Sequence, residues 1–142
     1  MLVTYTDDIP ADRAGAAWGP FVKIRPKYRD DAGLHAHERE HVLQWAEMAF
    51  LGALVFGALG YLWAGPFGIC CGALGLLTHN ALMRLRAYRL WAEVAAYRKQ
   101  MVQHESAISL ESAAWRLALP LYNLGLRQAE AIELLKKQGG AT

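Results

Sequence analysis

A long internal stretch without charged residues is the feature that most constrains how this chain can fold. Residues 48–83 contain no Asp, Glu, Lys or Arg, although these four types make up 20% of the sequence. The tetrapeptide Gly-Pro-Phe-Gly at residues 65–68 lies near the middle of the stretch, and glycine and proline together end helices. The pattern therefore predicts a helical hairpin with apolar arms over residues 48–64 and 69–83.

The two arms are slightly short for crossing a bilayer. At the usual helical rise they would be about 26 Å and about 22 Å long, whereas the hydrocarbon core of a membrane is about 30 Å thick. Two alternatives stay open for residues 48–83: shallow association with a membrane, or burial within the protein's own fold or a homo-oligomer interface. The arginines that follow the hairpin favour the membrane: Arg84, Arg86 and Arg89.

Length, charge and cysteine content narrow the class of protein further. A length of 142 residues fits a single domain, residues 1–142, and the net charge of +2 gives no large field of one sign. We therefore expect no nucleic-acid partner. Cys70 and Cys71 are adjacent, so they form neither a disulfide framework nor a CxxC metal clip. Residues 1–8 lack the pattern of a signal peptide, and we expect a membrane-associated or cytoplasmic protein.

The N-terminal residues 1–30 have the pattern of a small β-sheet. Residues 2–5 are β-prone, and residues 21–25 alternate apolar and basic side chains up to Pro26, which is typical of an exposed edge strand. An edge of this kind could pair with an extended peptide. We expect the two runs to pair with each other.

The remainder of the chain is predicted to be helical, so the expected fold class is α+β and predominantly helical. Asp30 or Asp31 can cap a helix that runs through residues 31–64. A second helical segment covers residues 69–100. The C-terminal helices occupy residues 105–138, the first capped by Ser106 and ended by Pro120, the second over residues 121–137 before Gly139 and Gly140.

An HExxH motif carries the strongest chemical signal. Residues 37–41 have the sequence His-Glu-Arg-Glu-His, and chance would give about 0.01 such motifs in a chain of this composition. On a helix, His37 and His41 lie on one face and can bind the same metal ion. Glu38 lies about 100° round the helix from His37, beside the metal, where it can accept a proton from a bound water. The alternative is a solvated helix face with incidental histidines.

A catalytic zinc site usually has a third protein ligand, which must come from elsewhere in the chain. If the hairpin is antiparallel and turns near its middle, His41 faces Glu93 and His37 faces Tyr97. Glu93 is also the one acidic residue of the second helical segment. We therefore expect Glu93 to be the third ligand; the alternative is an ion pair with Arg89, one helical turn earlier.

The other histidines are expected to lie outside this site. His35 is about 200° round the helix from His37. His79 would face residue 55, well away from the metal, and is expected to form a hydrogen bond between helices. His104 lies beyond the helix that carries Glu93 and is expected at the surface.

The HExxH motif and the later glutamate resemble the gluzincin pattern. In membrane-bound gluzincins of the HtpX and prenyl-protease kind, apolar helices also follow HExxH, and the later motif has Glu, then Ala three residues on, then Asp. Glu93 and Ala96 match that motif, and Tyr97 stands where the Asp would be. The short length and residues 35–45 are similar to small phage-encoded proteins described as metallopeptidases. The resemblance covers residues 21–100 and implies a minimal zincin-like fold.

The resemblance also implies a function. It predicts a zinc-dependent metallopeptidase that hydrolyses peptide bonds in a protein or peptide substrate, with Glu38 as general base. A tetrahedral oxyanion needs a further hydrogen-bond donor, for which Tyr97 is the candidate and Tyr88 an alternative. The predicted Zn²⁺ ligands are His37, His41 and Glu93.

The rival prediction belongs to a different functional class. In it, the apolar hairpin makes the protein a structural or assembly component that inserts into a membrane or joins copies of the chain. The metal site would then be inert or would only stabilise the fold.

Overall fold

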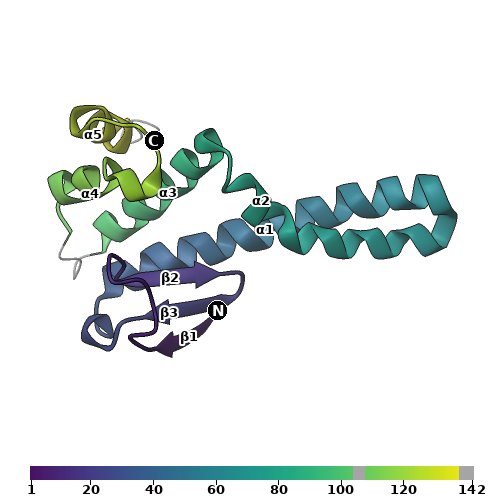
Figure 1. Ribbon diagram of the computed structural model, residues 1–142, viewed down its shortest axis with the longest axis horizontal. Coiled ribbons are helices and arrows are strands. Elements are labelled where there is room, and N and C mark those ends of the chain that lie inside the picture. The colour runs from purple at the N-terminus through teal and green to yellow at the C-terminus, as the bar shows by residue number, and fades with distance from the viewer. Residues whose placement is uncertain (104–107, 138–142) are drawn as a thin grey trace.

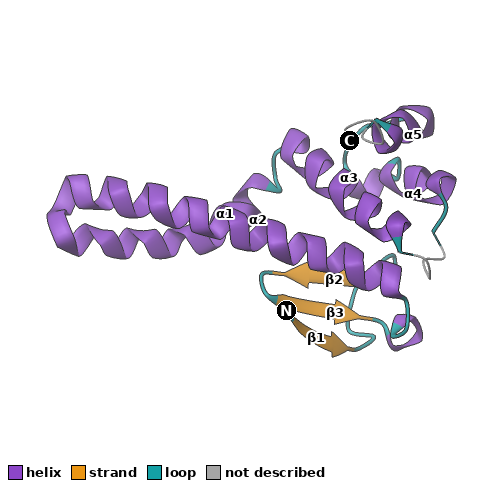
Figure 2. Ribbon diagram, turned by 180° about the vertical axis from the view of Figure 1, so that it is seen from behind, coloured by secondary structure: helices purple, strands orange, loops and turns teal. Residues whose placement is uncertain are grey.

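A helical hairpin projects like a rod from a smaller mixed head (Figures 1 and 2). The computed structural model describes residues 1–103 and 108–137. The head contains the three strands and the C-terminal helices, and the rod contains the apolar stretch. The predicted α+β, predominantly helical class with an N-terminal sheet is confirmed.

The sheet has the strand order β1-β3-β2. Strand β1 (Leu2–Tyr5) pairs with β3 (Phe21–Ile24), as predicted, and the two run parallel. Strand β2 (Gly15–Trp18) runs antiparallel to β3. The prediction that residues 21–25 form an edge strand is therefore wrong, because β3 lies in the centre. Val22 and Ile24 are buried on one face of β3. The alternation of apolar and basic residues therefore indicates a strand with one buried face, and such a strand can be central as well as at an edge. The Gly-Ala-Ala sequence of β2 has low strand propensity, and its pattern predicts no strand.

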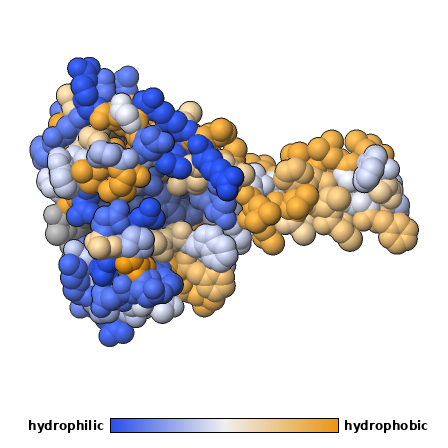
Figure 3. Space-filling view, viewed as in Figure 1, coloured by the Kyte–Doolittle hydropathy of each residue, from blue (hydrophilic) through white to orange (hydrophobic). Residues whose placement is uncertain are grey.

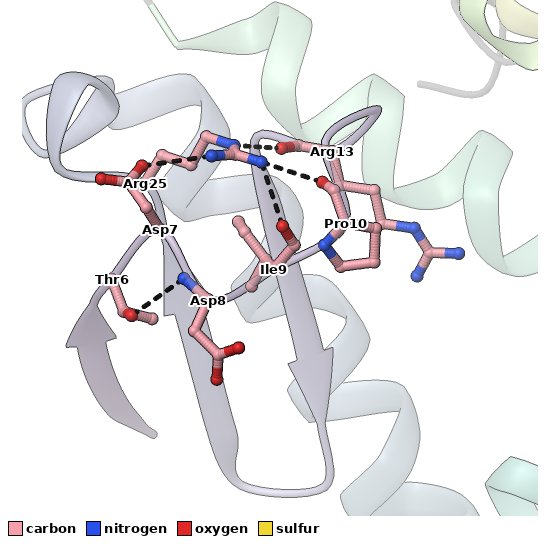
Figure 4. A network of polar contacts seen from close by, with 7 residues as sticks. All are labelled: Thr6, Asp7, Asp8, Ile9, Pro10, Arg13 and Arg25. Carbon is pink, nitrogen blue, oxygen red and sulfur yellow. Dashed lines mark hydrogen bonds and ion pairs between the residues drawn. The ribbon is translucent and has the colours of Figure 1, made fainter.

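Arg25, at the end of β3, fixes the loop between β1 and β2. Its guanidinium pairs with Asp7 at 3.1 Å and donates to the carbonyls of Ile9 and Pro10 at 3.0 Å and Arg13 at 2.8 Å (Figure 4). Charge-assisted bonds of this kind hold an irregular loop in one conformation. The loop is thereby held against the start of β2, at the wall of the functional site described below.

The long helix α1 (Ala32–Ala64) carries both the HExxH motif and the first apolar arm. It follows a short 3-10 helix, η1 (Pro26–Tyr28), and Asp31 caps it by accepting a hydrogen bond from the backbone amide of Leu34 at 2.8 Å. The predicted cap is confirmed. The helix ends at Gly65, whose positive φ of 61° suits glycine.

The return arm differs from the prediction of one continuous helix. It consists of a 3-10 helix, η2 (Gly65–Leu77), and a short helix, α2 (Thr78–Leu82). The chain then leaves helical geometry at Leu85, and α3 (Arg86–Val102) begins as a separate helix. The prediction of one helical segment over residues 69–100 is therefore wrong at this break.

The 3-10 geometry of the return arm also shifts the pairing of the two arms. A 3-10 helix rises about 2.0 Å per residue against about 1.5 Å in an α-helix, so the return arm needs fewer residues to reach the head. Gly75 accordingly packs on the backbone of Ala49 and Ala53, whereas the predicted register would place it opposite residue 59. The bend before α3 takes up the difference, and the predicted register is regained at the functional site.

The C-terminal helices pack on α3. They are α4 (Leu110–Leu117), the 3-10 helix η3 (Pro120–Tyr122) and α5 (Gln128–Lys136). The helix predicted over residues 121–137 begins later, because Asn123 and Gly125 have positive φ angles of 50° and 57° that interrupt helical geometry. Ser109 caps α4. The predicted cap Ser106, His104, Gly139 and Gly140 lie outside the described residues.

Candidate metal centre

Two histidines of α1 and one glutamate of α3 converge inside the head. His37 Nε2 and His41 Nε2 lie 3.2 Å apart, and Glu93 Oε2 lies 3.7 Å and 3.6 Å from them. The predicted opposition of His41 and Glu93 is confirmed. The opposition of His37 and Tyr97 is confirmed as well, since their ring centroids lie 4.6 Å apart.

The geometry of these three atoms fits a metal ion. A metal held tetrahedrally at about 2.0–2.1 Å, as zinc is by nitrogen and oxygen ligands, keeps those ligands about 3.3 Å apart. Glu93 Oε2 is buried and has no hydrogen-bond partner among residues 1–103 and 108–137. A buried carboxylate oxygen in that position is costly unless a cation compensates it, either protonated His41 at 3.6 Å or a bound metal ion. The His-His-Glu group can therefore hold a metal ion, as the sequence predicts.

Gln44 orients one of the two histidines. It is fully buried, and its amide nitrogen donates to the carbonyl of Ala92 at 3.1 Å, which leaves its amide oxygen to accept from His41 Nδ1 at 3.1 Å. A proton on Nδ1 would leave the lone pair of His41 Nε2 free to bind a metal ion. Sequence analysis did not single out Gln44, although its position three residues after His41, on the same helix face, is a usable signal.

Burial and charge set the protonation of the ligands. Burial lowers the pKa of His37 to about 3, so its imidazole is neutral and can ligate a metal. Burial opposes protonation of His41, but contact with Glu93 outweighs it and raises the pKa of His41 to about 9. His41 in turn holds the pKa of Glu93 below its ordinary value despite burial. Metal binding would displace a proton from His41.

Glu38 lies beside the metal-ligand group, packed against the start of β2. Burial raises the pKa of Glu38 to about 7. A Cβ atom at Gly15 would lie only 2.7 Å from Glu38 Oε1, so the carboxyl group occupies space that Gly15 leaves open. A carboxyl group with a pKa near neutrality is suited to accept and return a proton. The sequence analysis did not single out Gly15, since only the fold brings it to Glu38.

Tyr97 and Tyr122 form a hydroxyl pair next to the metal-ligand group. Their oxygen atoms lie 2.8 Å apart, and burial raises the pKa of Tyr122 to about 12 and that of Tyr97 further. Both hydroxyls therefore keep their protons at neutral pH and can donate hydrogen bonds. Tyr122 comes from η3 and was not predicted from the sequence, because nothing in its local pattern links it to the HExxH motif.

A cavity of about 520 Å³ gives access to these groups. Its walls come from the loop before β2 and β2 itself, from α1, α2, α3 and α4, and from η3. Arg13 and Arg116 line it and bring positive charge to its surroundings.

The remaining candidate residues lie in different places. His79 lines this same cavity, so the prediction that it lies far from the site is wrong; the short return arm brings it closer to the head. Its predicted hydrogen bond between helices is confirmed, since His79 Nδ1 and the Tyr88 hydroxyl lie 2.9 Å apart. Arg89 donates to the carbonyls of Met83 and Tyr122. His35 turns away to the carbonyl of Arg29, as expected.

Comparisons with known proteins found no relative of this chain. No protein-family model, curated protein or solved structure matches the chain.

Proposed function

We propose that this protein is a zinc-dependent metallopeptidase of minimal zincin-like architecture. The observation that carries the proposal is the convergence of His37 Nε2, His41 Nε2 and Glu93 Oε2 within 4.8 Å of one another, with Glu38 beside them in an accessible cavity. Three protein ligands that leave a fourth position open are typical of catalytic zinc, whereas structural zinc sites are closed by four.

Glu38 has the central role among the chain's own residues. A bound zinc ion would polarise the scissile carbonyl and lower the pKa of a coordinated water to about 7. Glu38 accepts the proton of the attacking water and delivers it to the departing amine, and its place in the cavity beside the three converging side chains suits both transfers. The developing oxyanion needs a hydrogen-bond donor, and the protonated Tyr97–Tyr122 pair is the candidate.

The edge of the sheet offers a way to hold the substrate. β2 is an edge strand, and its residues Gly15, Ala16 and Ala17 line the cavity. An extended peptide can add to such an edge through main-chain hydrogen bonds. The role first predicted for residues 21–25 therefore passes to β2, because β3 is paired on both sides.

The direct test is metal-dependent hydrolysis by the purified full chain. Protein purified without chelators should contain about one zinc ion per chain and should cleave unfolded casein. A chelator should abolish cleavage, and added zinc should restore it. Cleavage that persists after complete metal removal, or a metal-loaded protein that cleaves none of a broad peptide library, would contradict the proposal.

Replacing Gly15 by Ala should impair catalysis without impairing metal binding. The added Cβ would displace the Glu38 carboxyl group, and a misplacement of less than 1 Å can lower kcat about 10-fold or more. Zinc content should stay at the wild-type level, as measured by atomic absorption beside the steady-state kinetics. Gly57→Ala is the matched control, since its Cβ would meet its nearest neighbours at an ordinary 3.7 Å. Equal kcat values for the two variants would rule out this role for Gly15.

A second candidate function is supported by one specific observation. The hairpin exposes large apolar side chains over most of its length, as a membrane-inserting or oligomerising assembly protein would. In that case the metal would stabilise the head and no substrate would be cleaved. The cleavage assay separates the two functions, since only the metallopeptidase turns over.

A further inference from the structure

The hairpin is packed in the reverse of a water-soluble protein, with small residues inside and large apolar residues outside. A Cβ at Gly60 would collide with the carbonyl of Gly68, and a Cβ at Gly75 would collide with the backbone of Ala53. The arms therefore touch backbone to backbone, which is how helices associate when lipid surrounds them. The exposed side chains outside this seam include Phe50, Leu51, Leu54, Val55, Leu59, Tyr61, Leu62, Trp63, Phe67, Ile69, Leu74, Leu76 and Leu77.

These exposed side chains surround the rod and do not form a single stripe. Leu62, Trp63 and Phe67 at the tip are 81%, 90% and 88% exposed. Consecutive helix positions are about 100° apart, so Leu59, Leu62 and Trp63 together with Tyr61 cover every direction except that of the return arm. Figure 3 shows a mostly apolar rod, with a paler patch near its tip, beside a largely hydrophilic head. A second copy of the chain would cover one side of such a rod, whereas a bilayer covers all of it.

We propose that residues 48–77 are a membrane anchor that inserts as a hairpin into an anionic lipid bilayer. The helical segment Ala32–Leu82, which contains α1 and the return arm, is long and apolar enough to cross a membrane by length and composition, and only 17% of its apolar 18-residue window is buried. Because the rod is a hairpin, the sheet and the C-terminal helices stay on the same side of the membrane (Figure 1).

The head carries features that suit the lipid surface. The turn between β2 and β3 lies on the side of the head toward the rod, in both views, and it exposes Trp18 and Phe21 (Figures 1 and 2). Aromatic side chains favour the interface between lipid and water. Arg84 and Arg86, which are exposed directly after α2, supply positive charge for anionic headgroups.

The anchor would also set the distance between the candidate metal centre and the membrane surface. His41 lies seven residues before the apolar segment on the same continuous helix, which corresponds to about 10 Å of helix. The metal-binding cavity would thus lie next to the lipid surface. This placement follows from lipid binding and the helix alone, and it does not depend on whether the centre hydrolyses peptides.

Flotation with lipid vesicles tests the anchor. The full chain should float with vesicles of phosphatidylcholine and phosphatidylglycerol. It should bind vesicles of pure phosphatidylcholine about tenfold more weakly, because Arg84 and Arg86 then have no anionic headgroups to contact. The Leu62→Ser/Trp63→Ser variant should bind at least a hundredfold more weakly, since burial of each side chain contributes about tenfold or more. The matched control is Val102→Ser/Trp115→Ser, which changes an exposed aliphatic residue and an exposed tryptophan on α3 and α4 and should float as the wild type does.

A second measurement needs no disruptive variant. Lipids brominated in their acyl chains should quench part of the tryptophan fluorescence, and Trp63→Phe should show clearly less quenching than the wild type. A wild-type chain that stays out of the vesicle fraction, or a tip variant that floats as well as the control, would overturn the anchor. A discrete oligomer that does not bind vesicles, and that dissociates in the Leu62→Ser/Trp63→Ser variant, would also overturn the anchor and would favour self-association. Glu38→Gln should float normally even where hydrolysis is lost, so the anchor and the enzyme can fail separately.

Discussion

Glu38→Gln should lower the rate of peptide hydrolysis by about 100- to 10,000-fold, the range that a general base contributes. Gln has nearly the same shape as Glu and fits the space beside Gly15, but it cannot accept a proton from the attacking water. The zinc content should be unchanged, because Glu38 is not one of the three converging ligands. Steady-state kinetics and metal analysis of the same preparation measure both quantities.

Glu40→Gln provides a control within the same motif. Glu40 lies two residues later on α1, and it does not line the cavity that contains the metal-ligand group, as far as the described residues show. The same chemical change there should leave kcat within about twofold of the wild type, as surface substitutions usually do little. If Glu38→Gln and Glu40→Gln had equal rates, Glu38 could not be the general base.

The local periodicity of the sequence suffices to predict two members of the His-His-Glu group. His37 and His41 share a helix face because they are four residues apart, and this holds whatever surrounds the helix. Glu93 follows from the assumption that one antiparallel hairpin brings two segments to the same level. That assumption holds at the metal centre because the bend before α3 offsets the shift in the return arm.

The sequence does not predict the positions of residues that depend on the helical rise per residue or on tertiary packing. His79 was placed opposite residue 55 on the assumption of α-helical rise, and the 3-10 geometry of η2 moves it to the cavity. β2 has residues of low strand propensity and is held by pairing with β3, which is a tertiary effect. Gly15 and Tyr122 join the site through that same tertiary packing, so no local pattern marks them.

The two proposals share one continuous element, α1. Its first third carries both histidines and its remainder carries the first arm of the rod, with no helix break between them. A rigid helix transmits orientation, so insertion of the rod would fix how the cavity faces the lipid surface. Gln44 and Trp45 strengthen this link, since they donate to the carbonyls of Ala92 on α3 and Leu76 on the return arm.

Glu93→Gln should lower the affinity for zinc by about 100- to 1,000-fold, which is one ligand's share of a typical zinc-binding free energy. The amide is a poorer ligand and leaves the two histidines without the negative charge that compensates the ion.

Thermal unfolding with and without zinc measures this loss of affinity. Zinc at about 1,000 times its dissociation constant should stabilise the wild type by about 4 kcal/mol and raise Tm by roughly 8–16 °C. The same zinc concentration should raise the Tm of Glu93→Gln by only a few degrees, whereas Glu47→Gln, an exposed position on α1, should respond as the wild type does. An undiminished zinc response in Glu93→Gln would remove Glu93 from the ligand set, and the metallopeptidase proposal would lose the residue that distinguishes a catalytic centre from a pair of histidines.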